Sequence, residues 1–154
     1  MGGFSGSVQS VIAQTNATQV VNTGGTNEVA LATINIPPLQ PNSQIRVNFL
    51  FSVNNSGGTK TFRVRFGGIG GTAYYAVTAT TSINTQGFAT IRNRGSTNSQ
   101  VGAPSALQLG SSGTALVVSA VDTSAATTLV LTGQLTSGAD SINLESYTVE
   151  IINP

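Results

Sequence analysis

The feature that most constrains the fold of this chain is a two-residue alternation of apolar side chains between positions 45 and 53. The apolar positions are Ile45, Val47, Phe49, Phe51 and Val53, and charged, amide and hydroxyl side chains stand among the residues between them. Successive side chains of an extended chain point to opposite faces, so this period indicates a β-strand. The segment is predicted to be a strand with one face in a core.

A second alternating run follows the turn-forming residues 54–58. Phe62, Val64 and Phe66 are apolar, whereas Arg63 and Arg65 stand between them. The Asn, Ser and Gly residues of the intervening segment tolerate the positive φ angles of tight turns. The two runs are therefore predicted to pair as an antiparallel hairpin with a Phe-rich inner face and an Arg-bearing outer face.

Further short apolar runs recur along the chain, separated by Gly, Pro, Asn and Ser. Strands are predicted at 8–13, 20–22, 28–36, 73–80, 87–93, 106–109, 115–121, 127–135 and 142–152. No segment has the apolar stripe of an amphipathic helix, and the many Thr, Val and Ile residues disfavour helices, so at most a short helical turn is expected. The predicted fold is all-β, a single-domain antiparallel β-sandwich that is jelly-roll-like.

The last predicted strand changes its apolar phase. Ile142 and Leu144 share one face of an ideal strand, whereas Tyr147, Val149 and Ile151 fall on the other. A β-bulge places two residues opposite one and shifts the alternation by one position. A bulge near residues 145–146 is therefore predicted, since it would keep both sets of side chains in the core.

The chain is expected to hold one domain. Its length of 154 residues is enough to bury a core without disulfides or metals. The Pro-rich segment 37–41 cannot supply regular ladder hydrogen bonds, and we expect an ordered crossing between strands there rather than a linker. Residues 8–154 are therefore assigned to the sandwich domain. Residues 1–7, small and polar, are assigned to a flexible N-terminal arm, with a disordered terminus as the alternative.

The composition removes most catalytic chemistry. The chain has no His and no Cys, so Ser–His and Cys–His nucleophile pairs cannot form within it, and zinc would have only carboxylates and carbonyls as ligands. The carboxylates are Glu28, Asp122, Asp140, Glu145 and Glu150. A glycosidase needs two carboxyl groups about 5–9.5 Å apart across one cleft, and no motif brings two of these together. We expect no enzyme, and assign no catalytic, cofactor-binding or metal-binding residue.

Three other features have structural interpretations. Gly-rich residues 67–71 lack the following helix and the Lys-Ser/Thr pair of a phosphate cradle, and are predicted to form a mobile loop. Tyr74 and Tyr75 have rings suited to stacking on a sugar or a partner's surface, but adjacent strand residues face opposite ways, so one ring is expected in the core. Glu145 and Glu150 are expected on an exposed sheet face, opposite Arg46, Arg63 or Arg65.

The charge of the chain and the composition of its segments limit the partners and the cell compartment that we expect. The formal net charge of +1 comes from six basic and five acidic residues, too few for a basic field that gathers phosphates, so nucleic acid is not expected as a partner. No signal-peptide pattern or long apolar run is present, so neither secretion by that route nor membrane insertion is expected. The lack of Cys fits synthesis in a reducing cytosol.

Three parts of the sequence resemble a known class of proteins. They are residues 59–68 (TKTFRVRFGG), 91–100 (IRNRGSTNSQ), and 129–135 (LVLTGQL) with 141–150 (SINLESYTVE). These segments resemble small jelly-roll virion proteins of tailed bacteriophages. The resemblance extends over residues 8–152 and lies in the residue pattern of the strands and in the residues of the turns. The resemblance implies a non-enzymatic structural subunit, often a homotrimer. It carries over no functional residue, because this class has no catalytic motif.

The resemblance leaves two roles open. The size of the chain, which starts at its own Met and holds little beyond one β-domain, favours a capsid cement (decoration) protein. Such a protein would be made in the host bacterial cytoplasm and would bind itself and the major capsid protein on the outer capsid surface of the virion. The alternative is the receptor-binding tip of a tail or head fibre, whose Asn, Gln, Thr and Tyr side chains would suit a neutral host-surface glycan. A third reading is a jelly-roll module unrelated to phages.

Overall fold

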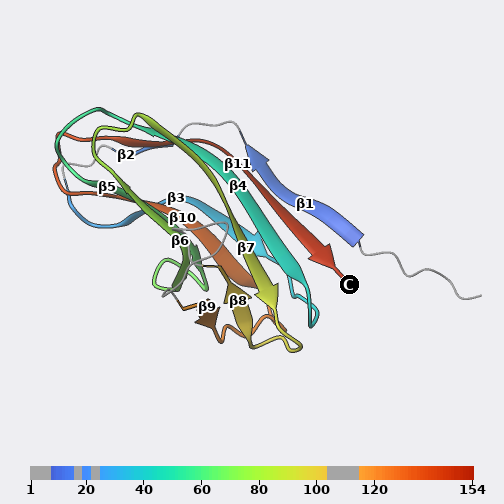
Figure 1. The fold of residues 1–154 in the computed structure, drawn as a ribbon. Helices are drawn as coiled ribbons and strands as arrows, with labels where there is room; N and C mark the ends of the chain where they lie inside the picture. The colour runs from blue at the N-terminus through green and yellow to red at the C-terminus, as the bar shows by residue number, and fades with distance from the viewer. Residues whose placement is uncertain (1–7, 16–18, 22–24, 104–114) are drawn as a thin grey trace, which may run out of the picture.

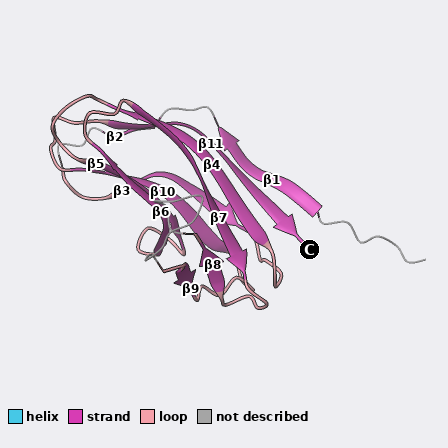
Figure 2. Cartoon of the chain, in the orientation of Figure 1, coloured by secondary structure: helices cyan, strands magenta, loops and turns pink. Residues whose placement is uncertain are grey.

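The computed structural model describes residues 8–15, 19–21, 25–103 and 115–154. Within these residues the chain forms strands and no helix (Figures 1 and 2). The strands are β1 (Val8–Thr15), β2 (Gln19–Val21), β3 (Val29–Ile36), β4 (Gln44–Val53), β5 (Lys60–Phe66), β6 (Thr72–Ala79), β7 (Asn84–Asn93), β8 (Gln100–Gly102), β9 (Val117–Ser119), β10 (Thr127–Leu135) and β11 (Ile142–Asn153).

The strands form two antiparallel sheets that pack face to face (Figure 1). The large sheet has the order β1-β11-β4-β7-β8-β9, with β2 also paired to β11, and the small sheet has the order β3-β10-β5-β6. If the eight strands β1, β3, β4, β5, β6, β7, β10 and β11 are counted in chain order, the sheets read 1-8-3-6 and 2-7-4-5. This is the double Greek-key order of a jelly roll. The predicted all-β, jelly-roll-like sandwich is confirmed.

The predicted hairpin between the two Phe-rich runs is wrong. β4 pairs with β11 and β7 in the large sheet, whereas β5 pairs with β10 and β6 in the small sheet. The connection after Val53 therefore carries the chain from one sheet to the other. The apolar faces do meet, but across the sandwich: the rings of Phe49 and Phe62 have centroids 5.0 Å apart. Alternation predicts which face is buried, and says nothing of which strand lies alongside.

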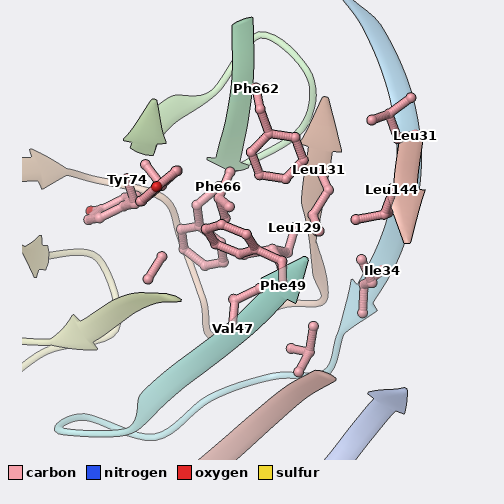
Figure 3. Close-up of a cluster of buried hydrophobic side chains, with 14 of the residues drawn as sticks. Leu31, Ile34, Val47, Phe49, Phe62, Phe66, Tyr74, Leu129, Leu131 and Leu144 are labelled. Atoms are coloured by element: carbon pink, nitrogen blue, oxygen red, sulfur yellow. The ribbon is translucent and has the colours of Figure 1, made fainter. Parts of the chain in front are cut away.

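The core fills the space between the sheets (Figure 3). Phe49 and Phe51 from the large sheet face Phe62 from the small sheet, and Tyr75 meets Phe49 edge-on at 4.7 Å between centroids. Leu129 on β10 adds a fully buried side chain. Each large apolar side chain buried in this way contributes roughly 1.5–3 kcal/mol relative to an exposed one.

The predicted bulge in the last strand is confirmed. The register of β11 against β4 shifts between Leu144 and Ser146. On either side of the shift the apolar side chains Ile142, Leu144, Val149 and Ile151 are all buried. The extra residue therefore allows one strand to keep both phases of its apolar pattern in the core.

The Pro-rich segment forms the predicted crossing. It joins β3 of the small sheet to β4 of the large one. Leu39 within it is 4% exposed, and its backbone N–H donates to the carbonyl oxygen of Thr123 at 2.8 Å. An apolar anchor and a backbone hydrogen bond thus hold a segment whose prolines cannot join a ladder.

Both adjacent tyrosines are buried, which corrects the expectation that only one would be. The pairing of β6 with β5 matches Val64 to Tyr75 and Arg65 to Ala73, so Tyr74 is an extra residue in the register. This bulge reverses the alternation and turns both rings inward, to 2% and 7% exposure. Neither ring is therefore available at the surface for stacking on a ligand.

Other strand predictions differ at their ends. The predicted strand at 115–121 is present only as β9, and β8 was not predicted. Two residues of β8 pair with β7 and all three pair with β9, and a strand of three residues is too short for local alternation to reveal. The predicted strand at 106–109 and the predicted arm at 1–7 lie outside the described residues.

Candidate binding surface

The carboxylates are distributed over separate parts of the molecule. Asp122 accepts hydrogen bonds from Ser124 in its own loop, and Asp140 lies in the turn before β11. Glu145 and Glu150 both lie on β11, about 16.5 Å apart along a strand that rises about 3.3 Å per residue, farther than a glycosidase pair. In the described part of the chain no group of three acidic residues is placed to hold a metal ion.

Glu28 is held by arginines on the outer face of the small sheet. Its carboxylate accepts two hydrogen bonds from Arg65, from Nε at 2.6 Å and Nη2 at 2.9 Å, and lies 3.3 Å from Arg63 Nη1. The bidentate bond from Arg65 is the largest cause that lowers the pKa of Glu28 below its ordinary value. The acidic partner of Arg63 and Arg65 is thus Glu28 rather than Glu145 or Glu150. This network ties the start of the β3 segment to β5.

Arg46 has the position that the sequence predicted. It is exposed on the outer face of the large sheet, where it is the register partner of Glu150 on β11. Opposite charges in directly facing positions of an antiparallel pair contribute roughly 0.2–1 kcal/mol. This pair lies on the surface considered below.

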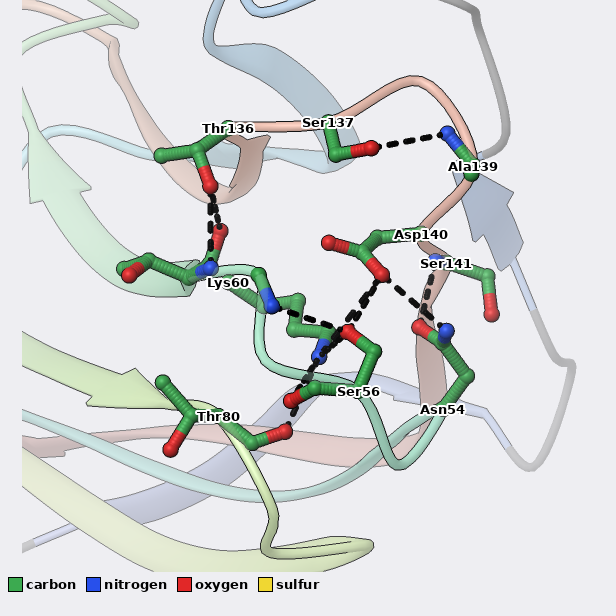
Figure 4. Close-up of polar contacts among 11 residues, drawn as sticks. Asn54, Ser56, Lys60, Thr80, Thr136, Ser137, Ala139, Asp140 and Ser141 are labelled. Atoms are coloured by element: carbon green, nitrogen blue, oxygen red, sulfur yellow. Dashed lines mark hydrogen bonds and ion pairs between the residues drawn. The ribbon is translucent and has the colours of Figure 1, made fainter.

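Lys60 and Asp140 form a buried polar cluster near the ends of β4 and β5 (Figure 4). The Lys60 ammonium donates to the Ser56 hydroxyl at 2.6 Å and to the Thr80 carbonyl at 2.9 Å. Asp140 Oδ1 accepts from Ser56 and from the Asn54 amide. These two bonds, with the Lys60 charge, lower the pKa of Asp140. Lys60, Ser56 and Asp140 Oδ1 are thus joined inside the fold, whereas Asp140 Oδ2 is buried without a hydrogen-bond partner among the described residues. The cluster is structural.

A second buried network surrounds Gln100 on β8. Its amide nitrogen donates to Asn93 Oδ1 at 2.9 Å and to the Val121 carbonyl at 3.0 Å, and its oxygen accepts from Ser119 and from the Val121 N–H. Asn93 donates in turn to Thr123 Oγ1 at 2.8 Å. These amide groups are used entirely to join loops to the large sheet, so they are not available to a ligand.

The outer face of the large sheet is different, because its amides point away from the fold. Two neighbouring rows of cross-strand partners cross β11, β4 and β7: Ser146, Leu50 and Gln86 form one, and Thr148, Asn48 and Phe88 form the other. Asn48 and Gln86 are exposed, and within the described residues their amide groups form no hydrogen bond. The amides of Asn48 and Gln86 are therefore free to meet a partner.

The same rows line an open hollow of about 160 Å³. Asn48, Leu50, Gln86, Ser146 and Thr148 line it, together with Phe49 and Tyr147. No charged side chain belongs to the lining. Phe88 lies beside it as the direct partner of Asn48, and 48% of this side chain is exposed. We call these residues, with Phe88, the sheet hollow.

A more apolar region lies at the β9 end of the same sheet. A second hollow of about 300 Å³ is lined by Thr90, Arg92, Val101, Gly102, Ala103 and Leu116. Leu116 is 59% exposed, and Val118, the register partner of Val101, is 56% exposed. We call Val101, Leu116 and Val118 the β9 patch.

The Gly-rich loop joins β5 to β6 and is closed by its own backbone. Gly67 and Gly68 have φ angles of 87° and 94°, which side chains rarely adopt, and the Gly71 N–H donates to the Gly68 carbonyl at 2.9 Å. A strand follows the loop, so the geometry of a phosphate cradle at a helix N-terminus is not formed here. The described residues also contain no helix of the length and apolarity needed to cross a membrane.

Sequence reasoning missed the sheet hollow, because its residues come from three strands far apart in the chain. The alternation did place Asn48 and Leu50 on the outer face of their strand. Nothing local indicated that β11 and β7 would flank them. Only the register brings the two rows together.

Comparison with known proteins assigns no family. No protein-family model matches the chain, and no curated protein matches its sequence. Among solved structures, the CBM2 module of the evolved Dit of Lactobacillus casei BL23 phage J-1 is similar with a TM-score of 0.38 at 14% identity, over 79% of this chain and 69% of that one.

Two structures of infectious bursal disease virus are also similar. The VP2 subviral particle gives a TM-score of 0.40 at 11% identity over 96% of this chain, and the Gx strain gives 0.30 at 13% identity over 96%. The chain spans about a third of those proteins, 32% and 36% of their lengths. These scores are too low to transfer a family or a function, and the strand order of the chain itself identifies its fold.

Proposed function

We propose that this protein is a non-enzymatic structural protein of a bacteriophage virion, a cement (decoration) protein that binds the outer surface of the head as a homotrimer and stabilises the shell. The observation that carries the proposal is the resemblance of residues 59–68, 91–100, 129–135 and 141–150 to small phage virion proteins. These segments contain β5, the turn between β7 and β8, and most of the strands β10 and β11 of the jelly roll. They therefore belong to the framework of the domain.

The chemistry of the surface supports a binding role. The Gln100 network and the Glu28 cluster use their polar groups inside the fold, and Lys60 is paired with Asp140. The chain also has no His or Cys for nucleophilic catalysis. The net charge of +1 leaves little long-range repulsion between copies, which favours self-association. The β9 patch supplies exposed apolar side chains of the kind that the centre of a protein interface buries. We assign this patch to contact with the major capsid protein.

Immunogold electron microscopy of the parent phage tests the location. Antibody against this chain should place gold over the heads, whereas gold confined to the tail tip would reject the cement role. Native mass spectrometry of the purified protein should give a trimer. A monomer at all concentrations would reject the proposed homotrimer.

Binding to heads that lack the protein tests the assigned surfaces. Val118→Asp should abolish binding without unfolding the domain, because the side chain is 56% exposed, and Val11→Asp, which changes an equally exposed valine at the other edge of the sheet, is the matched control. Deletion of residues 1–7 should also weaken binding if they form an arm that reaches the shell. Unchanged binding of both altered proteins would reject these assignments.

The sheet hollow favours a second function, the receptor-binding tip of a tail or head fibre. Its free amide and hydroxyl groups and its lack of charge suit a neutral glycan on the host surface. Gold at the tail tip, together with a hit on a glycan array, would support this function over the first.

A further inference from the structure

We propose that the sheet hollow binds one neutral sugar ring, with Asn48 and Gln86 as its hydrogen-bonding groups and Phe88 as its apolar platform. The inference deepens the second function above by assigning its site and its ligand class. The evidence is the position of these residues on two adjacent rows of one sheet face.

The size of the hollow limits the ligand. At about 160 Å³ it is smaller than the roughly 300–1,000 Å³ of sites that enclose drug-sized molecules. It is also open to solvent along the face of the sheet. A single ring of a longer chain fits such a site, with its neighbours lying along the sheet.

The hydrogen-bonding groups match the hydroxyls of a sugar. An amide side chain offers a carbonyl acceptor and two N–H donors side by side, as needed by a pair of neighbouring hydroxyls. The amides of Asn54, Asn93 and Gln100 are used inside the fold, whereas those of Asn48 and Gln86 form no hydrogen bond within the described residues. A ligand here gains hydrogen bonds without breaking any of the protein's own.

The apolar groups match the other face of a sugar. A pyranose ring has a face of C–H groups that packs on an aromatic ring, and such rings combine large contact area with little loss of side-chain freedom. Phe88 directly faces Asn48, and Leu50, half-buried, directly faces Gln86. Each row thus places an amide next to an apolar side chain. Directly facing side chains have Cβ atoms about 4.5–5.5 Å apart, close enough for one ring to touch both.

The lining selects against charged ligands. In the row on one side, Arg46 and Glu150 face each other and offset each other's charge. On the other side, the Glu145 carboxylate accepts a hydrogen bond from the Ser52 hydroxyl, and this negative charge also disfavours an acidic ligand. No side chain of the lining is charged, so the carboxylate of an acidic sugar would lose hydration without gaining an ion pair. The ligand class is therefore the neutral hexoses and N-acetylhexosamines.

NMR titration of the complete chain tests the site. The ¹⁵N-labelled protein is titrated with glucose, galactose, mannose, N-acetylglucosamine and, as the acidic probe, sialic acid. At least one neutral sugar should shift the amide signals of Asn48, Gln86 and Thr148, with a Kd of about 1 mM, a value typical of weak single-ring binding. Sialic acid should cause no shift at these residues.

Variants of single residues decide whether the sheet hollow is responsible for sugar binding. Asn48→Ala, Gln86→Ala and Phe88→Ala should each weaken binding about tenfold, the loss expected when one good contact is removed. Asn84→Ala, on the same strand as Gln86 and Phe88, and Ile83→Ala, which truncates another exposed apolar side chain, should bind as the unchanged protein does. All five truncated side chains are exposed, so unaltered spectra elsewhere should show that the fold is retained.

Absence of shifts with every neutral sugar, shifts confined to another surface, or binding that survives in all three hollow variants would overturn the inference. Each outcome is independent of the location of the protein in the virion, which microscopy decides. Failure of the sugar site and failure of the proposed function can therefore be told apart.

Discussion

The ammonium of Lys60 lies 3.8 Å from the carboxylate of Asp140 inside the sandwich, and only 0% and 4% of the two side chains are exposed. Ser56 connects them, because its hydroxyl accepts from Lys60 and donates to Asp140. The two charges come from the start of β5 and the turn before β11, which belong to different sheets. The pair therefore holds the two layers together at this end of the sandwich.

Replacement of Lys60 should destabilise the protein strongly. Lys60→Met would leave the Asp140 carboxylate buried without its cation, and such uncompensated charges cost more than the pair contributes. The double variant Lys60→Met with Asp140→Asn should recover part of the lost stability. Thermal unfolding of the single and double variants measures this coupling, and strictly additive effects would show that the two residues do not interact.

Stability should fall in acid partly through Glu28. Its pKa is lowered in the folded state, chiefly by the hydrogen bond from Arg65, so the stability it adds is fully present above its ordinary pKa of about 4.3 and is lost as the pH falls through the lowered value. Glu28→Gln should therefore be less stable than the unchanged protein near neutral pH, and the gap should narrow in acid. Urea unfolding over a pH series measures the gap, and a constant difference would contradict this assignment.

Gly87→Ala should destabilise the core. A Cβ atom at position 87 would lie 2.7 Å from the Phe49 ring and 3.0 Å from the Tyr75 hydroxyl oxygen. Overpacking of this kind costs about 1–3 kcal/mol. Gly57→Ala is the matched control, because its Cβ would meet no atom within 4 Å. Chemical unfolding of both variants should separate them, and equal stabilities would reject the close approach.

Tyr74→Phe should show how much the hydrogen bond between the Tyr74 and Ser119 hydroxyls contributes to the free energy of unfolding. The Tyr74 and Ser119 oxygens are 2.7 Å apart, which joins β6 at the edge of one sheet to β9 at the edge of the other. Ser119 keeps its bond to Gln100 when the phenol is removed, so the expected loss is about 0.5–1.5 kcal/mol. Tyr75→Phe, whose hydroxyl forms no hydrogen bond within the described residues, should change the unfolding free energy less.

Binding to the phage head should depend weakly on salt. The β9 patch is apolar and the net charge is +1, so long-range ion pairing has a small part in the proposed contact. Sedimentation of heads with bound protein at low and high ionic strength measures this. Release at moderate salt would show that ion pairs hold the complex.

Local patterns predicted the faces of the strands but not their neighbours. The alternation in β4 and β5 placed Phe49 and Phe62 inside correctly, and the phase change in β11 located its bulge. The inferred hairpin failed because a turn-rich segment of this length serves equally to join strands within a sheet or to cross between sheets. The bulge at Tyr74 was missed, since an aromatic pair gives no phase signal of its own.

The amino-acid sequence by itself determined the class of the fold and the inward and outward sides of its main strands, because two-residue alternation is a property of the extended backbone. It also limited the chemistry, because a chain without His or Cys lacks the side chains that most hydrolases use. Only the tertiary structure decided which acidic side chain pairs with which basic one, as Glu28 does with Arg65. It also decided which side chains line the sheet hollow. Those contacts join residues far apart in the chain, and strand order and register, set by packing of the whole sandwich, bring them together.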